Sequence, residues 1–297
     1  MTTSREDRIF NSINNLVLGA VMLVIAYPLY FTIIASVSDP LEVARGAIAL
    51  LPKGFTIDAY RNVLGNSTVW LGYRNTAFYT ITGTLLDLGI TLTCAYALSK
   101  KWLPGRRLLN WCFLFTMYFG GGLIPTYLLV KGLGLINTPY VMVVLGAISV
   151  YNLIVVRNFF ETSIPGELYE AARVDGCSEF GIFLKIALPL SKVIIAVMAL
   201  FYGVARWNSY FNALLYLGKE SLYPLQLVLR NILLMNQTMD MSSMLDSDQV
   251  QAVLRRILTA ETMKYALIFV ASFPVLCAYP FVQKYFVRGV MIGSVKG

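Results

Sequence analysis

The sequence predicts an all-α integral membrane protein with six transmembrane helices, organised as a single domain over residues 1–297. Of the 297 residues, 57% are hydrophobic and only 13% are charged. That composition leaves too little polar surface for a soluble domain of this size. Apolar runs of about 20 residues, the length of a bilayer-spanning helix, also recur along the chain.

The six expected spans lie at about 13–35, 77–98, 109–130, 138–157, 189–213 and 262–285. The first run is too long for the apolar core of a signal peptide, so we expect a retained first helix. The core helices then occupy about 77–285. Three glycines, Gly120 to Gly122, interrupt the third span together with Pro125. Either a broken helix that lines a cavity or close helix packing through small residues explains them.

The orientation follows from the basic residues of the short loops. Lys100, Lys101, Arg106 and Arg107 lie between the second and third spans, whereas the next short loop carries only Lys131. Lys and Arg are enriched in cytoplasmic loops, so the first of these loops is expected in the cytoplasm. Six spans then place both termini there. The same bias explains the net charge of +8 without nucleic acid.

The sequence contains few candidates for catalytic or metal-binding residues. The chain has no histidine, and the four cysteines match no metal-site or disulfide spacing. They are Cys94, Cys112, Cys177 and Cys277. No G-x-x-x-x-G-K-[ST] phosphate loop occurs. We therefore expect no catalytic residue, no metal site and no cofactor on this chain.

The loop at about 158–188, between the fourth and fifth spans, predicts two short helices at a sharp angle. Pro165 suits the first turn of a helix, where its missing N–H costs nothing. Gly176 fits the stop of that helix because glycine takes the left-handed conformation without penalty. Ser178 can cap a second helix, and Pro189 ends or kinks it.

The same loop resembles the EAA loop of ABC importer permeases. The resemblance lies in several fixed positions at fixed spacing: Glu170, Ala171, Ala172, Gly176, Ile186, Leu188 and Pro189. Five further segments are similar to the carbohydrate-uptake, maltose-type branch of this family: Tyr96 to Ser99, Ile124 to Tyr127, Gly134-Leu135, Trp207-Asn208 and the tail from Gly289 to Gly297. Asn236 to Asp240 and Tyr279 to Phe286 resemble its polysaccharide-associated subgroup. Lys192, where proline is frequent, and Cys177, where alanine is frequent, depart from the pattern.

The resemblance implies a type I importer transmembrane domain in a bacterial cytoplasmic membrane that works by alternating access. A second permease subunit, two ATPase subunits and an extracytoplasmic solute-binding protein would be the partners. ATP and Mg would bind the ATPase subunits. The resemblance assigns the coupling role to Glu170 to Ala172, with Asp175 at the end of the same helix, and to Gly176, Ile186, Leu188 and Pro189.

Six residues within the spans are candidates for the substrate pathway. Asp87 and Arg206 are charges inside membrane helices, where charges face a partner or a wet cavity. They either pair with each other or line the pathway. The other candidates are Asn152, Trp207, Asn208 and Asn212. Amides and flat rings bind sugars, but interhelical hydrogen bonds and interfacial anchoring explain the same residues.

The extracytoplasmic segment at about 214–261 contacts the binding protein, plugs the pathway or is purely structural. Asp240, Asp246 and Asp248 within it fit no calcium loop. Three other functions stay open on the sequence. A permease for another solute is disfavoured by the maltose-type motifs, and an ion-gradient transporter would leave the EAA loop without purpose. The lack of histidine argues against a membrane enzyme.

Overall fold

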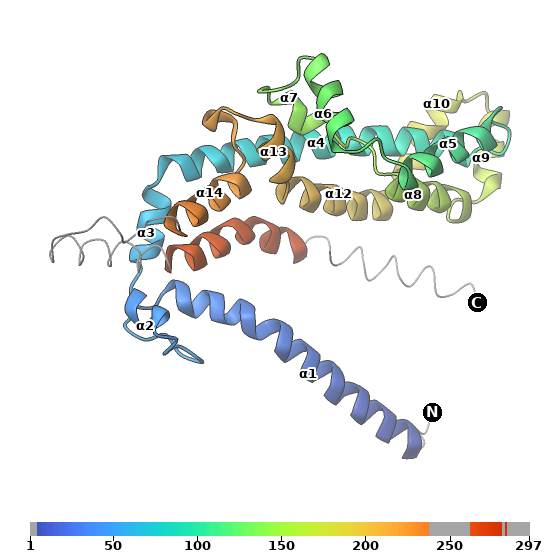
Figure 1. Ribbon diagram of the computed structural model, residues 1–297. Coiled ribbons are helices and arrows are strands. Elements are labelled where there is room, and N and C mark those ends of the chain that lie inside the picture. The colour runs from blue at the N-terminus through green and yellow to red at the C-terminus, as the bar shows by residue number, and fades with distance from the viewer. Residues whose placement is uncertain (1–4, 238–261, 281–282, 284–297) are drawn as a thin grey trace. The chain divides into compact units, whose positions relative to one another are not determined.

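The computed structural model describes residues 5–237, 262–280 and 283, and Figure 1 shows its ribbon. The described part consists of helices and their connections, without strands. This confirms the all-α prediction. The expectations for residues 238–261, including the three aspartates, and for the tail from Gly289 lie outside the described residues. The chain forms two compact units, residues 1–70 with 229–274 and residues 71–228 with 275–297.

The helices follow one another along the chain with short connections. They are α1 (Arg5–Ser36), α2 (Pro40–Ala44), α3 (Asp58–Gly65), α4 (Ser67–Ser99), α5 (Arg106–Tyr118), α6 (Leu123–Gly132), α7 (Tyr140–Val144), α8 (Val150–Thr162), α9 (Gly166–Val174), α10 (Glu179–Ile182), a π-helical turn (Phe183–Ala187), α11 (Leu188–Leu190), α12 (Lys192–Trp207), α13 (Phe211–Tyr216), a 3-10 turn (Glu220–Leu222) and α14 (Leu225–Gln237). A further helix covers Thr262–Pro280.

The number of single-helix spans is smaller than predicted. Among the described residues, α1, α4 and Thr262–Pro280 are long and apolar enough to cross a membrane, and two bent pairs raise the number to five at most. The fourth expected span, 138–157, is instead divided between α7 and α8. The break contains Gly146 at φ +75°, in the left-handed region that favours glycine.

The third expected span, 109–130, is also broken rather than continuous. α5 and α6 meet at 112°, and Gly122 has φ +86°. A Cβ on Gly120 would meet nothing within 4 Å, and one on Gly121 would meet only Pro125 at 3.9 Å. Within the described chain, close helix packing therefore does not explain Gly120 and Gly121, and the positive φ at the bend explains Gly122.

The fifth expected span, 189–213, is shorter than predicted. Pro189 belongs to the segment Glu179–Leu190, and this segment meets α12 at 81°. The bend falls on the buried Ser191, so α12 begins only at residue 192. At the other end, α12 stops at Trp207, and Asn208 is its C-cap.

The first unit packs the end of α1 against α3 and the last helix. The Phe31 and Tyr265 rings meet edge to face at 5.8 Å, and the Tyr60 and Phe269 rings do so at 6.2 Å. The Ser36 and Tyr60 hydroxyls are hydrogen-bonded at 2.8 Å. Most of α1 before this contact exposes large apolar side chains. Such a surface suits lipid or a neighbouring protein.

The second unit contains two apolar cores that share α4. One core joins the last turns of α4 with α8, α9, α10 and α12. The other joins Tyr79 of α4 with α6, α7, α13 and α14. In Figure 1, α5, α8, α9 and α10 accordingly gather at one end of this unit. The predicted coupling loop therefore lies at a defined end of α4.

Candidate functional site

The predicted coupling loop forms two helices joined by a tight turn. α9 begins directly after Pro165, and Gly176 follows its end with φ +75°. The Gly176 amide donates to the Arg173 carbonyl at 3.0 Å, and the Cys177 amide donates to the Ala172 carbonyl at 2.9 Å. These two bonds are those of a Schellman motif, which ends a helix at a left-handed residue. Gly176 therefore acts as the helix stop that its sequence position predicts.

The second helix of the loop begins with the predicted cap. The Ser178 side-chain oxygen accepts a hydrogen bond from the Gly181 amide at 3.2 Å. Arg173 of α9 reaches across the turn and donates to Glu179 of α10 at 2.7 Å. The ion pair therefore connects the two helices across the turn.

The loop turns one face of α9 outward. Glu170, Ala171 and Asp175 are exposed, whereas Ala172 is buried in the core of the chain itself. Of the two alanines, only Ala171 is therefore open to a partner. Its small side chain allows another backbone to approach closely beside a carboxylate.

The later positions of the loop have mixed exposure. Ile186 and Leu188 are half-buried against the core of α4, α8 and α12, whereas Pro189 is exposed. The first two side chains therefore anchor the second helix to the membrane-spanning part. Their contacts are therefore made within the chain.

Aromatic and basic side chains that sequence reasoning missed tie the loop to the end of α4. The Lys100 Nζ lies 4.1 Å from the Tyr96 ring centroid and 3.2 Å from that of Tyr169 in α9. The Tyr96 ring lies 4.9 Å from that of Phe183, and its hydroxyl donates to Glu179 at 3.3 Å. These partners are far apart in the chain, so no local pattern reveals their contact.

Burial shifts the pKa values of Lys100 and Tyr169. Burial lowers the pKa of Lys100 from its ordinary 10.5 to about 8, although the nearby Glu179 opposes this shift. Burial also raises the pKa of Tyr169 from 10.0 to about 12. The hydroxyl of Tyr169 therefore stays neutral, and the Lys100 charge is held chiefly by aromatic faces.

Asp87 and Arg206 pair with each other inside the second unit. The Arg206 Nε donates to one Asp87 oxygen at 2.9 Å, and its Nη2 donates to the other at 2.6 Å. The Arg206 Nη1 donates to the carbonyls of Met142 at 2.7 Å and Leu145 at 3.0 Å, at the end of α7. The carboxylate is 1% exposed and the arginine 10%. The pair joins α4, α7 and α12.

Of the four other pathway candidates, Trp207 and Asn208 are neighbours at the end of α12, and the other two lie in α8 and α13. Asn152 is buried in the first turn of α8, and Asn212 is half-buried in α13. Trp207 is buried at the end of α12, where its ring meets that of Tyr73 at 6.0 Å. The exposed Asn208 donates to the Val204 carbonyl at 3.0 Å. The Gln226 side chain of α14 donates to the Asn208 side-chain oxygen at 3.4 Å, which is a contact between helices.

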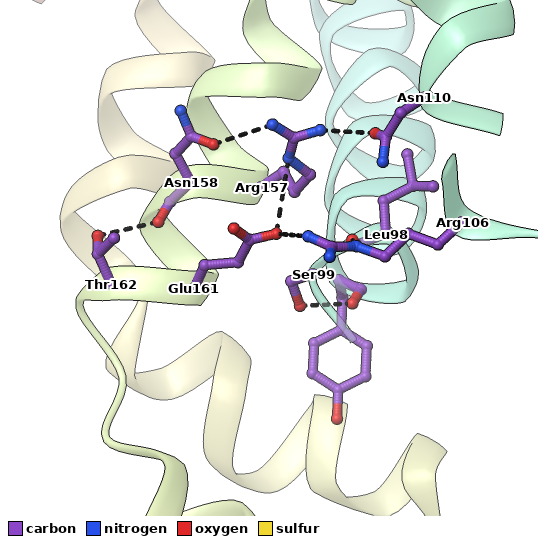
Figure 2. A network of polar contacts seen from close by, with 9 residues as sticks. Leu98, Ser99, Arg106, Asn110, Arg157, Asn158, Glu161 and Thr162 are labelled. Atoms are coloured by element: carbon purple, nitrogen blue, oxygen red, sulfur yellow. Dashed lines mark hydrogen bonds and ion pairs between the residues drawn. The ribbon is translucent and has the colours of Figure 1, made fainter. Parts of the chain in front are cut away.

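A second charged cluster lies between α5 and α8 (Figure 2). Arg106 donates to the Leu98 carbonyl at 2.6 Å and to the carboxylate of Glu161. Arg157 donates to Asn110 at 2.6 Å, and its Nε lies 3.7 Å from Glu161. The cluster fixes the basic loop between α4 and α5 against α8.

Apolar helices of spanning length, together with a buried ion pair on one of them, indicate a multi-pass membrane protein. The chain belongs to the family of binding-protein-dependent transport system inner membrane components, whose model matches residues 4–292. It is therefore a permease of the cytoplasmic membrane.

Individual proteins support the same assignment. The chain is 41% identical to protein LplC of Bacillus subtilis (strain 168), over 100% of this chain and 98% of that protein. It is 38% identical to the polygalacturonan/rhamnogalacturonan transport system permease protein YtcP of the same organism, over 98% of this chain and 100% of that protein. A solved bacterial ABC transporter involved in the import of the acidic polysaccharide alginate matches with a TM-score of 0.84 and 35% identity, over 96% of this chain and 99% of that one.

Proposed function

We propose that this chain is the permease subunit of an ATP-driven importer and that it carries an oligosaccharide or polysaccharide fragment across the cytoplasmic membrane. A solute-binding protein would deliver the substrate from outside, and a second permease would complete the pathway. Two ATPase subunits would bind ATP and Mg, because this chain has no phosphate loop. Both termini and the coupling loop would face the cytoplasm.

The observation that carries this proposal is the rigid, outward-facing coupling loop. Glu170, Ala171 and Asp175 form an exposed face, while the Schellman turn and the Ser178 cap fix the shape behind it. A carboxylate beside a small side chain suits a basic groove on a partner. The inner face of the same element is packed into the core of α4, α8 and α12. A partner that moves the loop would therefore move the helices.

The contacts at the end of α4 suggest how motion would pass inward. Lys100 and Tyr96 touch Tyr169 and Phe183 of the loop. Closure of the ATPase subunits would displace α9 and with it the end of α4. The broken pairs around Gly122 and Ser191 supply places where helices can rotate against each other. Such rotation would switch the cavity between inward- and outward-facing states.

Carbohydrate is the proposed substrate class because YtcP is named for polygalacturonan and rhamnogalacturonan, and the solved neighbour for alginate. Arg206 does not argue for an acidic sugar, because all three nitrogens of its guanidinium already donate to Asp87 or to backbone carbonyls. Trp207, Asn208 and Asn212 remain the proposed contacts along the pathway, through ring stacking and amide hydrogen bonds.

The test is purification of the tagged protein from its native membrane in mild detergent, with its partners identified by mass. We expect a second permease and an ATPase dimer, and we expect the ATPase to be lost in a Glu170→Ala, Gly176→Val variant. Glu220→Ala is the matched control, because Glu220 is also exposed but belongs to the other end of the unit. A stable protein that never retains an ATPase would contradict the proposal and favour an ion-gradient transporter.

A further inference from the structure

A cavity of about 570 Å³ lies beside the charged cluster of Figure 2. It is bounded by the loop between α4 and α5, the start of α5 and one face of α8. Its volume is within the range of small-molecule and cofactor sites. Four cationic side chains and two apolar ones are prominent in its wall: Lys101, Arg106, Arg107, Arg157, Trp111 and Leu114.

The positive charge of this cavity is only partly balanced. Glu161 compensates Arg106 and lies near Arg157. Lys101 and Arg107 are exposed and form no ion pair or hydrogen bond with a described residue. α5 also begins after Gly105, which has no side chain to cap it. Its positive dipole end adds to the same field. The cavity therefore favours an anion.

The apolar part of the wall indicates what kind of anion fits. Trp111 is 63% exposed on α5, and α5 belongs to a bent pair that is apolar enough to span a membrane. Exposed tryptophans are typical of the membrane interface at headgroup level. Leu114 follows one turn further along α5, where an acyl chain would run. A free phosphate ion would make no apolar contact with Trp111 and Leu114.

We propose that the cavity binds the phosphate of an anionic glycerophospholipid, with Lys101, Arg106 and Arg107 on the phosphate and Trp111 beside the glycerol and acyl chains. Basic pockets beside transmembrane helices recognise such headgroups through charge. The lipid would lie in the same leaflet as the coupling loop, because Arg173 of α9 stacks 5.8 Å from Trp102 of the basic loop. Its assignment to the cytoplasmic leaflet rests on the proposed function.

This site would connect membrane composition to coupling. The basic loop contacts the coupling loop through Lys100 and Tyr169, and it contacts the cavity through Lys101 and Arg106. A bound phosphate would reduce the repulsion among the cations and hold this loop in one conformation. Anionic lipid would therefore stiffen the connection between α9 and the end of α4.

The test is lipid binding to the purified protein with its co-purifying partners, measured by native mass spectrometry. Phosphatidylglycerol and phosphatidylcholine with identical acyl chains are titrated separately, and inorganic phosphate is added as a competitor. The Lys101→Gln, Arg107→Gln variant removes two cations without breaking the ion pairs of Arg106 and Arg157. The Lys131→Gln, Lys219→Gln variant is the control, because it removes the same charge at exposed positions away from the cavity.

We expect wild type and control to prefer phosphatidylglycerol. The test variant should bind it about 30-fold more weakly, because each of the two removed cations contributes about 1 kcal/mol. Phosphatidylcholine binding should not change. Equal affinity for both lipids, or an equal loss in test and control variants, would overturn the proposal. Variant-sensitive binding of inorganic phosphate without lipid preference would overturn the lipid as the source. ATPase co-purification is scored in the same samples, so failure of the transport assignment is seen separately from failure of the lipid site.

Discussion

The two charged clusters of the second unit use the same residue types in opposite settings. The Asp87–Arg206 pair is almost fully buried, and each guanidinium nitrogen of Arg206 donates to the carboxylate or to a backbone carbonyl. The cluster of Arg106, Arg157 and Glu161 is about one-quarter exposed and leaves cations beside an open cavity. The first arrangement fixes three helices, whereas the second retains charge that a ligand can use.

Solvent explains this difference. A buried charge without a partner costs several kcal/mol, which is why each guanidinium nitrogen of Arg206 is directed at an acceptor. Partly exposed charges are screened and hydrated, so an excess of cations beside the cavity costs little. The same principle predicts how strongly each cluster responds to substitution.

The largest effect is expected from breaking the buried pair on one side. Arg206→Met leaves the Asp87 carboxylate buried without its partner, and we expect a loss of about 3–5 kcal/mol in stability. The Asp87→Leu, Arg206→Met double variant should recover most of that loss, because it removes both charges. Thermal unfolding in detergent, followed by size-exclusion chromatography, measures both. A double variant as unstable as the single one would show that the carbonyl contacts of Arg206 dominate.

A smaller loss is expected from crowding the same arginine. A Cβ on Gly83 would lie 2.9 Å from the Arg206 Nε, whereas one on Gly89 would meet nothing within 4 Å. Gly83→Ala should therefore cost about 1–3 kcal/mol, since the buried guanidinium has little room to shift. Gly89→Ala in the same helix is the matched control and should be neutral or slightly stabilising. Equal unfolding midpoints for the two variants would contradict the packing seen around Arg206.

The exposed cluster should tolerate substitution better. Glu161→Gln removes the carboxylate shared by Arg106 and Arg157, and we expect a loss of about 1 kcal/mol or less because the group is screened. The loss should shrink as salt concentration rises. Unfolding midpoints at low and high salt measure this dependence. A loss as large as that of Arg206→Met would remove the distinction between the two clusters.

A pH-dependent effect is expected from Lys100, which is buried and faces aromatic rings. Its pKa falls to about 8 in the folded protein, against 10.5 in the unfolded chain. Between these two pH values the unfolded chain binds more protons than the folded protein, so the free energy of unfolding should rise with pH above about 8. Below about pH 8 the buried charge should destabilise the folded protein by its full amount. Unfolding midpoints at pH 7, 8 and 9 should rise in wild type relative to Lys100→Met. Parallel profiles would show that the rings hold the charge at no cost.

Local patterns were sufficient for part of this protein. The composition predicted an all-α membrane protein, and the loop residues predicted the helix stop at Gly176 and the cap at Ser178, both of which the structure contains. These features depend on residues within a few positions of each other, where backbone conformation and capping act. The same locality explains the errors in the spans, because hydropathy measures apolar content and not direction. The glycines offered a broken third span as one alternative and Pro189 an end or kink, but hydropathy could not give the 112° angle at Gly122 or place the 81° bend at Ser191.

The sequence by itself thus determined the class of protein, the family resemblance and the chemistry available to the coupling loop. Only the tertiary structure decided that Arg206 is occupied by Asp87, that Ala172 faces inward and that Lys100 connects α4 to α9. The physical reason is that burial and pairing depend on residues distant in the chain. A charge becomes a structural bond or a binding group according to how much water and how many partners the folded chain leaves around it.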